Sequence, residues 1–237
     1  PSDKFAEIRL YFFYEIAYNG AGDKSGVDKQ KEVKCVEYIR EIFAQYDRQC
    51  IRVYQAYNPT IAKEAISLQT FGKNFNVNRM TWIKPSFLWL MYRSNWGTKK
   101  NQECILAIDV YQSKFNEILQ KAVLTSPDSK SYTGIQWEKA FDETTVYCQW
   151  DSDRNINGNA INRAAIQIGL KRNTLREFLD TGICRIEDLT PLVKKWNEQR
   201  KNGKLNSKNL PVERIYPVKD KTIRSRLNMT YGSVKKA

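Results

Sequence analysis

The sequence of 237 residues contains no histidine. This absence excludes Ser-His-Asp and Cys-His nucleophilic machinery, histidine-ligated metals and imidazole acid–base catalysis within one chain. Any general base must be an Asp, Glu, Lys, Tyr or Cys. A purely binding role gains weight, and catalysis through positioning and electrostatics stays open.

Paired cysteines and long apolar runs are also missing. The five cysteines are odd in number and widely scattered, with no C-x-x-C pair, so neither a disulfide framework nor a zinc site is indicated and we expect no metal. No apolar stretch approaches the length of a transmembrane helix, and no apolar signal core opens the chain. We therefore expect an intracellular, cytoplasmic protein without a membrane partner.

Positive charge is concentrated near one end of the chain. The net charge is +13, of which residues 194–237 carry +10 through 13 Lys/Arg and three acids. We predict a basic tail at 218–237 that attracts phosphate backbones without reading sequence. The alternative is a solvated terminus that only aids solubility.

The periodicity of apolar residues predicts an α+β fold. We expect a single domain, residues 40–217, with a mixed or antiparallel twisted sheet flanked by helices, preceded by a helical N-terminal extension at 1–39. Alternation from Cys50 predicts a strand, and Asn58-Pro59 supply the N-cap and first-turn proline of the next helix. Further strands are expected at 80–83, 104–110, 144–150, 164–170 and 184–189, and helices at 31–45, 86–95, 114–124, 174–179 and 191–200.

The segment 79–96 combines three tryptophans with a tyrosine, two arginines and a lysine. Pro85 fits the first position of a helix. Helical spacing puts Trp89, Tyr92, Arg93 and Trp96 on one face, which suits a flat anionic ligand such as a nucleotide or a base. The alternative is that these tryptophans are core, and we expect Trp82 and Trp89 to be buried and structural.

A polar stretch at 151–157 superficially resembles a calcium loop. Ile156 occupies the position where that loop needs glycine, and Asn162 replaces its bidentate glutamate, so calcium binding is not expected. Two interpretations remain: a polar turn after a strand, or a cluster in which Gln149, Asp151 and Arg154 face a ligand cleft.

Several motifs resemble a family of uncharacterised proteins, domain of unknown function family 4291. The longest is the run RMTWIKPS at 79–86, and the others are IRVYQAYNP at 51–59, VYCQWDSDR at 146–154, AAIQIGL at 164–170, IEDLTP at 186–191 and LPVERIYP at 210–217. The resemblance covers roughly residues 40–217. The resemblance implies that the chain is a member of this family, and it implies no particular activity.

The order of strands and helices is also similar, at the level of the fold, to ADP-ribosyltransferases. This similarity implies a nucleotide-dependent transferase with NAD as the donor. By analogy the candidate catalytic residues are Arg52, Thr81 and Lys84, and the candidate nucleotide contacts are Tyr54, Arg79, Tyr92, Arg93 and Gln167. We expect Arg52, Arg79, Thr81, Lys84, Tyr92 and Arg93 to converge on one cleft. The family's glutamate would fall near Gln167, where none occurs, so Glu103 or Glu187 would have to replace it.

The second hypothesis is a nucleic-acid-binding or RNA-processing protein. The aromatic helix would be a stacking platform, and the basic tail would be an electrostatic track. In both cases the partner is a nucleotide or a nucleic acid.

Overall fold

The computed structural model describes residues 39–126 and 134–230, all of which belong to the compact unit Val36–Ala237. The alternating apolar segments of the sequence form two main sheets. The antiparallel three-stranded sheet has the order β2 (Cys50–Tyr57), β4 (Cys104–Tyr111), β8 (Ile183–Asp188). The mixed four-stranded sheet has the order β3 (Thr81–Ile83), β7 (Ala160–Leu170), β6 (Val146–Arg154), β5 (Ala122–Leu124). A small pair joins β1 (Phe43–Ala44) to β9 (Arg214–Ile215).

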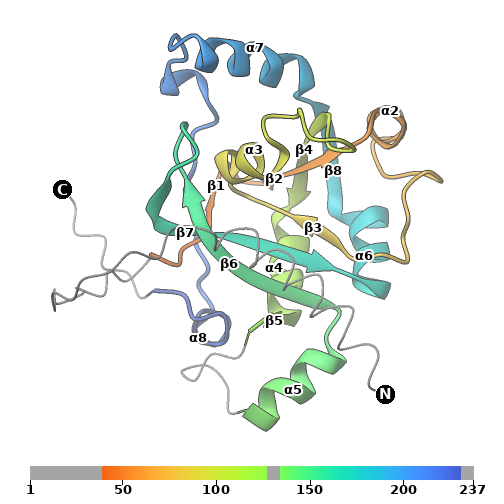
Figure 1. Cartoon of the computed structure of the whole chain (residues 1–237). Coiled ribbons are helices and arrows are strands. Elements are labelled where there is room, and N and C mark those ends of the chain that lie inside the picture. Colours follow the sequence, from red (N-terminus) through yellow and green to blue (C-terminus); the bar gives the residue numbers. More distant parts are fainter. Residues whose placement is uncertain (1–38, 127–133, 231–237) are drawn as a thin grey trace, which may run out of the picture. The chain divides into compact units, whose positions relative to one another are not determined.

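The main hydrophobic core lies between these two sheets, which cross each other in Figure 1. Successive residues of a strand point to opposite faces, so every second residue of each strand enters this core. Ile51 and Val53 enter from the three-stranded sheet, and Ile166 and Ile168 enter from the four-stranded sheet. The α+β class predicted from the sequence is confirmed, with two sheets in place of one.

The two sheets meet at the end of β3. The backbone N–H of Tyr54 donates to the carbonyl of Lys84 at 2.8 Å, in an isolated antiparallel bridge between β2 and the residue after β3. Directly opposed residues of such a bridge have their side chains on one face. Lys84 therefore lies on the same side of the sheet as Tyr54 and Arg52, away from the main core.

Helices cover the edges and outer faces of the sheets (Figure 1). None of those in the described ranges has both the length and the apolar character that a membrane crossing requires. Their bounds are α2 (Pro59–Leu68), α3 (Phe87–Ser94), α4 (Gln112–Lys121), α5 (Gly134–Glu143), α6 (Arg172–Glu177) with the π-helical turn η1 (Phe178–Gly182), α7 (Thr190–Lys201), the 3₁₀ turn η2 (Ser207–Asn209) and α8 (Lys221–Arg226).

A second hydrophobic cluster attaches α3 and α7 to the three-stranded sheet. Phe87 and Leu90 of α3 and Trp196 of α7 pack there against Tyr54. Phe87 meets Tyr54 and Trp196 edge to face, with ring centroids 5.4 Å and 5.5 Å apart. Such a T-shaped arrangement is favoured by the ring quadrupoles. This packing fixes α3 beside the junction of the two sheets.

The N-termini of the helices carry the caps that their sequences suggest. Asn58 caps α2 by accepting from the backbone N–H of Ile61 at 3.0 Å, which confirms the predicted cap. Ser86 caps α3 with its side-chain oxygen. Pro85 therefore precedes the cap and does not open the helix as predicted, because a β-region Ser86 lies between them.

Three expected boundaries differ in the structure. The predicted helix 114–124 ends at Lys121, because Ala122–Leu124 form β5 and pair in parallel with β6, which buries all three residues. The predicted turn at 151–157 begins later, since Asp151–Arg154 belong to β6. The predicted helix 31–45 fails in its described part, where Phe43–Ala44 form β1. The N-terminal extension expected at 1–39 lies outside the described residues but for its last position.

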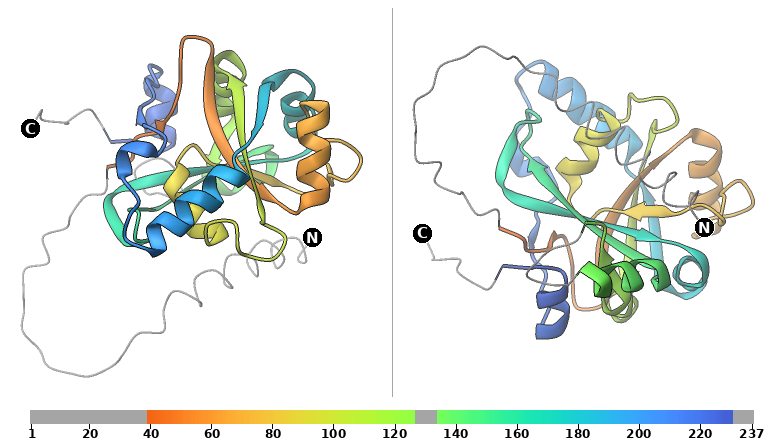
Figure 2. Two further views of the ribbon diagram at one scale, coloured as in Figure 1. Left: turned by 90° about the horizontal axis from the view of Figure 1, so that it is seen from above. Right: turned by 60° about the horizontal axis from the view of Figure 1, so that its bottom comes forward.

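Residues 218–230 are part of the folded domain, which corrects the prediction of a basic tail. Val218, Ile223, Leu227 and Met229 are buried in the main core. Figures 1 and 2 show α8 at the same end of the domain as α5. Two of its arginines make internal contacts, because Arg224 pairs with Glu41 and Arg226 donates to the last carbonyls of α4.

Candidate functional site

The outer face of the four-stranded sheet, which points away from the main core, carries a cluster of polar side chains. Gln149 of β6 and Gln167 of β7 are cross-strand partners, so both lie on this face, and Asp151 follows Gln149 on the same side of β6. These residues come from two different sequence motifs, VYCQWDSDR and AAIQIGL. The register of the β6–β7 hairpin brings them together.

The carboxylate of Asp151 is held by two glutamine amides. Gln149 Nε2 donates to one of its oxygens at 2.8 Å, and Gln167 Nε2 donates to the other in a short contact. Hydrogen bonds to the ionised form favour a carboxylate over its acid. Gln167 is buried, whereas Gln149 and Asp151 are half-buried. The cluster therefore presents an oriented negative charge that solvent still reaches.

Lys84 and Trp82 extend this face onto β3. Trp82 is paired with Gly169 and is half-buried, and Lys84 Nζ donates to the carbonyl of Trp82 at 3.1 Å. A Cβ at Gly169 would lie 2.7 Å from Met80 Sδ and 3.1 Å from the indole of Trp82. A side chain at this position would collide with that ring, so the glycine of AAIQIGL and the tryptophan of RMTWIKPS depend on each other.

An aromatic and cationic rim borders the polar face on the side of α3. The rings of Trp89 and Tyr92 are stacked, with centroids 5.4 Å apart. The guanidinium of Arg154, at the end of β6, lies 4.1 Å from the ring centroid of Tyr92. Trp89 is buried as predicted, and Tyr92 exposes 36% of its surface. The cation over the predicted aromatic face is Arg154, not Arg93.

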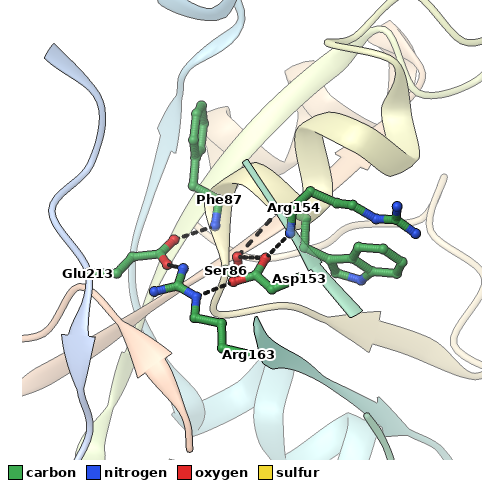
Figure 3. A network of polar contacts seen from close by, with 7 residues as sticks. Ser86, Phe87, Asp153, Arg154, Arg163 and Glu213 are labelled. Carbon is green, nitrogen blue, oxygen red and sulfur yellow. Dashed lines mark hydrogen bonds and ion pairs between the residues drawn. The ribbon is translucent and has the colours of Figure 1, made fainter. Parts of the chain in front are cut away.

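A buried ionic network connects the strand end that carries Arg154 to the start of α3, and so holds the two parts of this rim together (Figure 3). Asp153 has no exposed surface, accepts from Ser86 Oγ at 2.9 Å and from the backbone N–H of Arg154 at 2.8 Å, and pairs with Arg163 Nε at 2.6 Å. Arg163 continues to Glu213 at 2.9 Å. Glu213 also accepts from the backbone N–H of Phe87, the first residue of α3, at 2.6 Å. An anion at that position is stabilised by the unpaired amides and the dipole of the helix.

The environment of Glu213 in this network is unfavourable to a negative charge. Burial raises the pKa of Glu213 to about 7, and this effect outweighs the Phe87 amide and the Arg163 guanidinium, which both favour the carboxylate. The side chain is only 8% exposed. Its hydrogen bonds tie the segment before β9 to the start of α3, so the network is a scaffold for the rim.

Arg52 does not join the polar face. Its guanidinium forms two hydrogen bonds to its cross-strand neighbour Asp109, at 2.7 and 2.8 Å, and pairs with Glu187 at 3.1 Å. The Asp109 carboxylate raises the pKa of Arg52 further. Arg52 and Lys84 lie on the same side of the sheet, as the convergence prediction requires, but the charge of Arg52 is already paired.

Thr81 points the other way, into the core between the sheets. Its hydroxyl contacts Gln55 Nε2 at 2.7 Å and the hydroxyl of Tyr57 at 2.8 Å. Gln55 and Tyr57 lie on the face of β2 opposite to Arg52, because odd and even positions of a strand alternate. The structure therefore does not bring Arg52 and Thr81 into one cleft.

The remaining predicted residues divide between the site and its surroundings. Tyr54 is completely buried against Phe87, so its ring has no open face on which a nicotinamide could stack. Arg79 is exposed at the far end of β3 from Lys84, about 17 Å of extended chain away. Arg93 is half-buried on α3. Lys84, Tyr92 and Gln167 are the predicted residues that belong to the polar face or its rim.

The sequence-based prediction missed the residues of the buried network. Asp153, Arg163 and Glu213 are separated in the sequence and meet only through the hairpin and the segment before β9. The signals that could have found them are the second aspartate of VYCQWDSDR and the lone acid of LPVERIYP. Of the alternative in which Gln149, Asp151 and Arg154 face one cleft, the structure shows the hydrogen bond between Gln149 and Asp151 and the contact of Arg154 with Tyr92. The cleft itself stays a prediction.

These motifs also decide where the chain stands among known proteins. No curated protein matches the sequence. A family model described as a domain of unknown function (DUF4291) matches residues 41–216, which include the whole of both main sheets, the polar face and the buried network. The chain belongs to this family.

Proposed function

We propose that the chain is a nucleotide-using transferase whose reacting groups lie on the outer face of the four-stranded sheet. The observation that carries this proposal is the Asp151 carboxylate, held on both oxygens by amides from two neighbouring strands. A charged group that is oriented before the substrate arrives needs no reorganisation during the reaction. NAD is the donor to test first.

The chemistry that suits such a carboxylate is substitution at the anomeric carbon of a nucleotide sugar. When the glycosidic bond of NAD breaks, nicotinamide leaves with the bonding electrons and the ribose becomes oxocarbenium-like. A carboxylate close to that carbon stabilises the positive charge. The acceptor atom then forms the new bond to the same carbon and releases its proton to solvent.

The other groups of the face have roles that follow from their charge and position. Gln149 and Gln167 are positioning residues, because they fix the plane of the carboxylate. Lys84 suits the pyrophosphate, since it extends the same face and is a cation. Arg52 and Thr81 have no direct part in this scheme.

The test combines donor binding with turnover. We expect NAD to raise the melting temperature of the wild-type chain, because a ligand at 100 times its Kd stabilises the folded state by about 2.7 kcal/mol. Asp151→Asn keeps the shape of the side chain and should retain NAD binding while nicotinamide release is lost. Gln167→Ala should lower the rate less. Asp180→Asn is the matched control, since Asp180 is an exposed aspartate on η1.

Two results would sink the proposal. One is an unchanged melting temperature with saturating NAD, ATP and their diphosphate analogues, which would show that the chain does not bind a nucleotide. The other is nicotinamide release from Asp151→Asn at the rate of Asp180→Asn, which would remove the carboxylate from the chemistry.

A further inference from the structure

The segment from α7 to η2 is an uncompensated basic surface. Between Thr190 and Asn209 the sequence has six Lys/Arg and one acid, Glu198. Val193 and Trp196 of α7 are buried, whereas Lys194 and Lys195, which lie between them in the sequence, are exposed. The five exposed lysines of this segment, Lys194, Lys195, Lys201, Lys204 and Lys208, form no ion pair with any described residue.

This basic surface borders the aromatic rim of the candidate site. Leu205, between the lysines, and Ile156, at the tip of the β6–β7 hairpin, pack on the same cluster that holds α3 and α7. In Figure 1 the hairpin tip reaches up beside the chain that leaves α7. Gly158 of that tip lies against Tyr92, because a Cβ there would be 3.7 Å from its ring.

The rim has unused hydrogen-bonding capacity as well as an aromatic face. Arg154 Nε and Trp89 Nε1 are buried, and neither has a hydrogen-bond partner among the described residues. Trp89 is 95% buried as a residue, which makes an unpaired indole N–H there unusual. Among the described residues, the guanidinium of Arg154 donates one hydrogen bond, from Nη1 to the carbonyl of Gly158 at 3.4 Å. A guanidinium stacked on an aromatic ring, with open N–H groups, suits a phosphate next to a base.

We propose that the lysines of α7 and residues 201–208, together with Tyr92 and Arg154, bind single-stranded nucleic acid. The lysines contact the phosphates, and Tyr92 stacks on a base beside Arg154. An acidic protein or an anionic membrane would use the lysines but has no base to stack on Tyr92, so the stack selects nucleic acid. A second part of the proposal rests on the proposed function. The bound strand is the acceptor of the ADP-ribosyl group, and it reacts at the anomeric carbon beside Asp151.

The test measures binding without catalysis. A short fluorescein-labelled single-stranded RNA and the DNA of the same sequence are titrated with the full chain at two salt concentrations, and anisotropy is recorded. Lys201→Glu/Lys204→Glu/Lys208→Glu should weaken binding at least about ten-fold and lower the salt slope by about 2, at roughly 0.7 per phosphate contact. Lys63→Glu/Lys219→Glu/Lys221→Glu has the same charge change at exposed positions elsewhere and should weaken binding much less.

The stacking half is tested at Tyr92. Tyr92→Ala should weaken binding about ten-fold at unchanged salt slope, and Tyr92→Phe, which keeps the ring, should not. The nucleic-acid proposal is overturned if the wild type binds neither oligonucleotide, or if the two triple variants bind equally. It is also overturned if Tyr92→Ala binds like the wild type, since the surface would then be a site for any anion.

The acceptor role can fail separately from the proposed function. The Lys201/Lys204/Lys208 variant should still release nicotinamide from NAD when water is the only acceptor, with the water oxygen bonding to the anomeric carbon and its proton going to solvent, and Asp151→Asn should still bind RNA. Label from NAD should appear on the oligonucleotide with the wild type. Nicotinamide release without such labelling overturns the acceptor role and leaves the transferase proposal standing.

Discussion

Replacement of Arg163 by methionine should destabilise the domain by about 4 kcal/mol. Arg163 lies between two buried carboxylates, Asp153 and Glu213, whose side chains are 0% and 8% exposed. Removal of one partner from a buried ion pair typically costs about 3–5 kcal/mol, because the other charge stays buried and uncompensated. The remaining hydrogen bonds from Ser86 Oγ and the backbone N–H of Phe87 keep the loss within that range.

The pH dependence of this loss has a definite sign. The Arg163 guanidinium opposes the rise that burial causes in the pKa of Glu213, so without it the folded-state pKa of Glu213 should lie further above its unfolded value. The folded state then binds more protons than the unfolded state, so the free energy of unfolding rises as the pH falls through this range. In the wild type the pKa of Glu213 is about 7, so the wild type gains less stability over the same pH range. The difference between Arg163→Met and wild type should therefore shrink between pH 7 and pH 5.

Equilibrium urea denaturation at both pH values measures this effect. With an m-value of about 2 kcal/mol/M, the midpoint of Arg163→Met should fall by about 2 M at pH 7. Arg176→Met is the control, because Arg176 is an exposed arginine on α6 without an ion pair among the described residues. It should change the stability by less than about 0.5 kcal/mol. Equal midpoints for the two variants, or a difference that grows towards pH 5, would refute the account of the network.

Three further changes test the packing. A chain that ends at Pro217 lacks the buried residues of α8 and should melt at a markedly lower temperature or fail to fold; melting like the full chain would show that α8 is dispensable. Trp89→Ala should cost about 3–5 kcal/mol in urea denaturation, and a loss as small as that of a surface change would contradict its burial. Gly169→Ala should cost about 1–3 kcal/mol, because the new methyl meets Met80 Sδ and Trp82; unaltered near-ultraviolet circular dichroism and stability would contradict this.

The strands and the main helices could be predicted because their signals are local. The apolar run at 104–110 forms β4, and Asn58-Pro59 begin α2 as their capping chemistry requires. The short strand Ala122–Leu124 could not be separated from the helix before it, because its apolar residues continue the helical pattern. Its parallel pairing with β6 decides its conformation, and that pairing joins segments more than 20 residues apart.

The charge of the C-terminal region concealed a packed helix. The cations of the predicted basic tail, residues 218–237, conceal an apolar pair: Ile223 of α8 and its C-cap residue Leu227 are four residues apart and both enter the core. Asp220 caps that helix by accepting from two backbone amides. Both signals are in the sequence. Lysines and arginines beside an apolar stripe can cover a core with their aliphatic stems, so a basic run is not by itself a free tail.

The partners of a surface cation could not be predicted at all. The analogy with ADP-ribosyltransferases predicts that Arg52 acts on a nucleotide. Its ion pairs are with Asp109, 57 residues later and across the strand pair, and with Glu187. These contacts depend on the register of β2, β4 and β8, which the local sequence does not specify.

The strand register gives the carboxylates Asp151 and Asp153 different environments, although they are two residues apart on β6. Asp151 lies in the candidate site, and Asp153 lies in the buried network that supports it. In a regular strand, residues two positions apart lie on the same face, so the two carboxylates would have similar surroundings. The pairing of β6 with β7 is irregular between Ser152 and Arg154, and such a bulge redirects the side chains that follow it. Asp153 is thereby buried against Ser86 and Arg163, while Asp151 stays on the polar face with the two glutamines. Because one irregular step supports both the rim and the candidate site, a change that removes it should disturb α3 and the Asp151 cluster together.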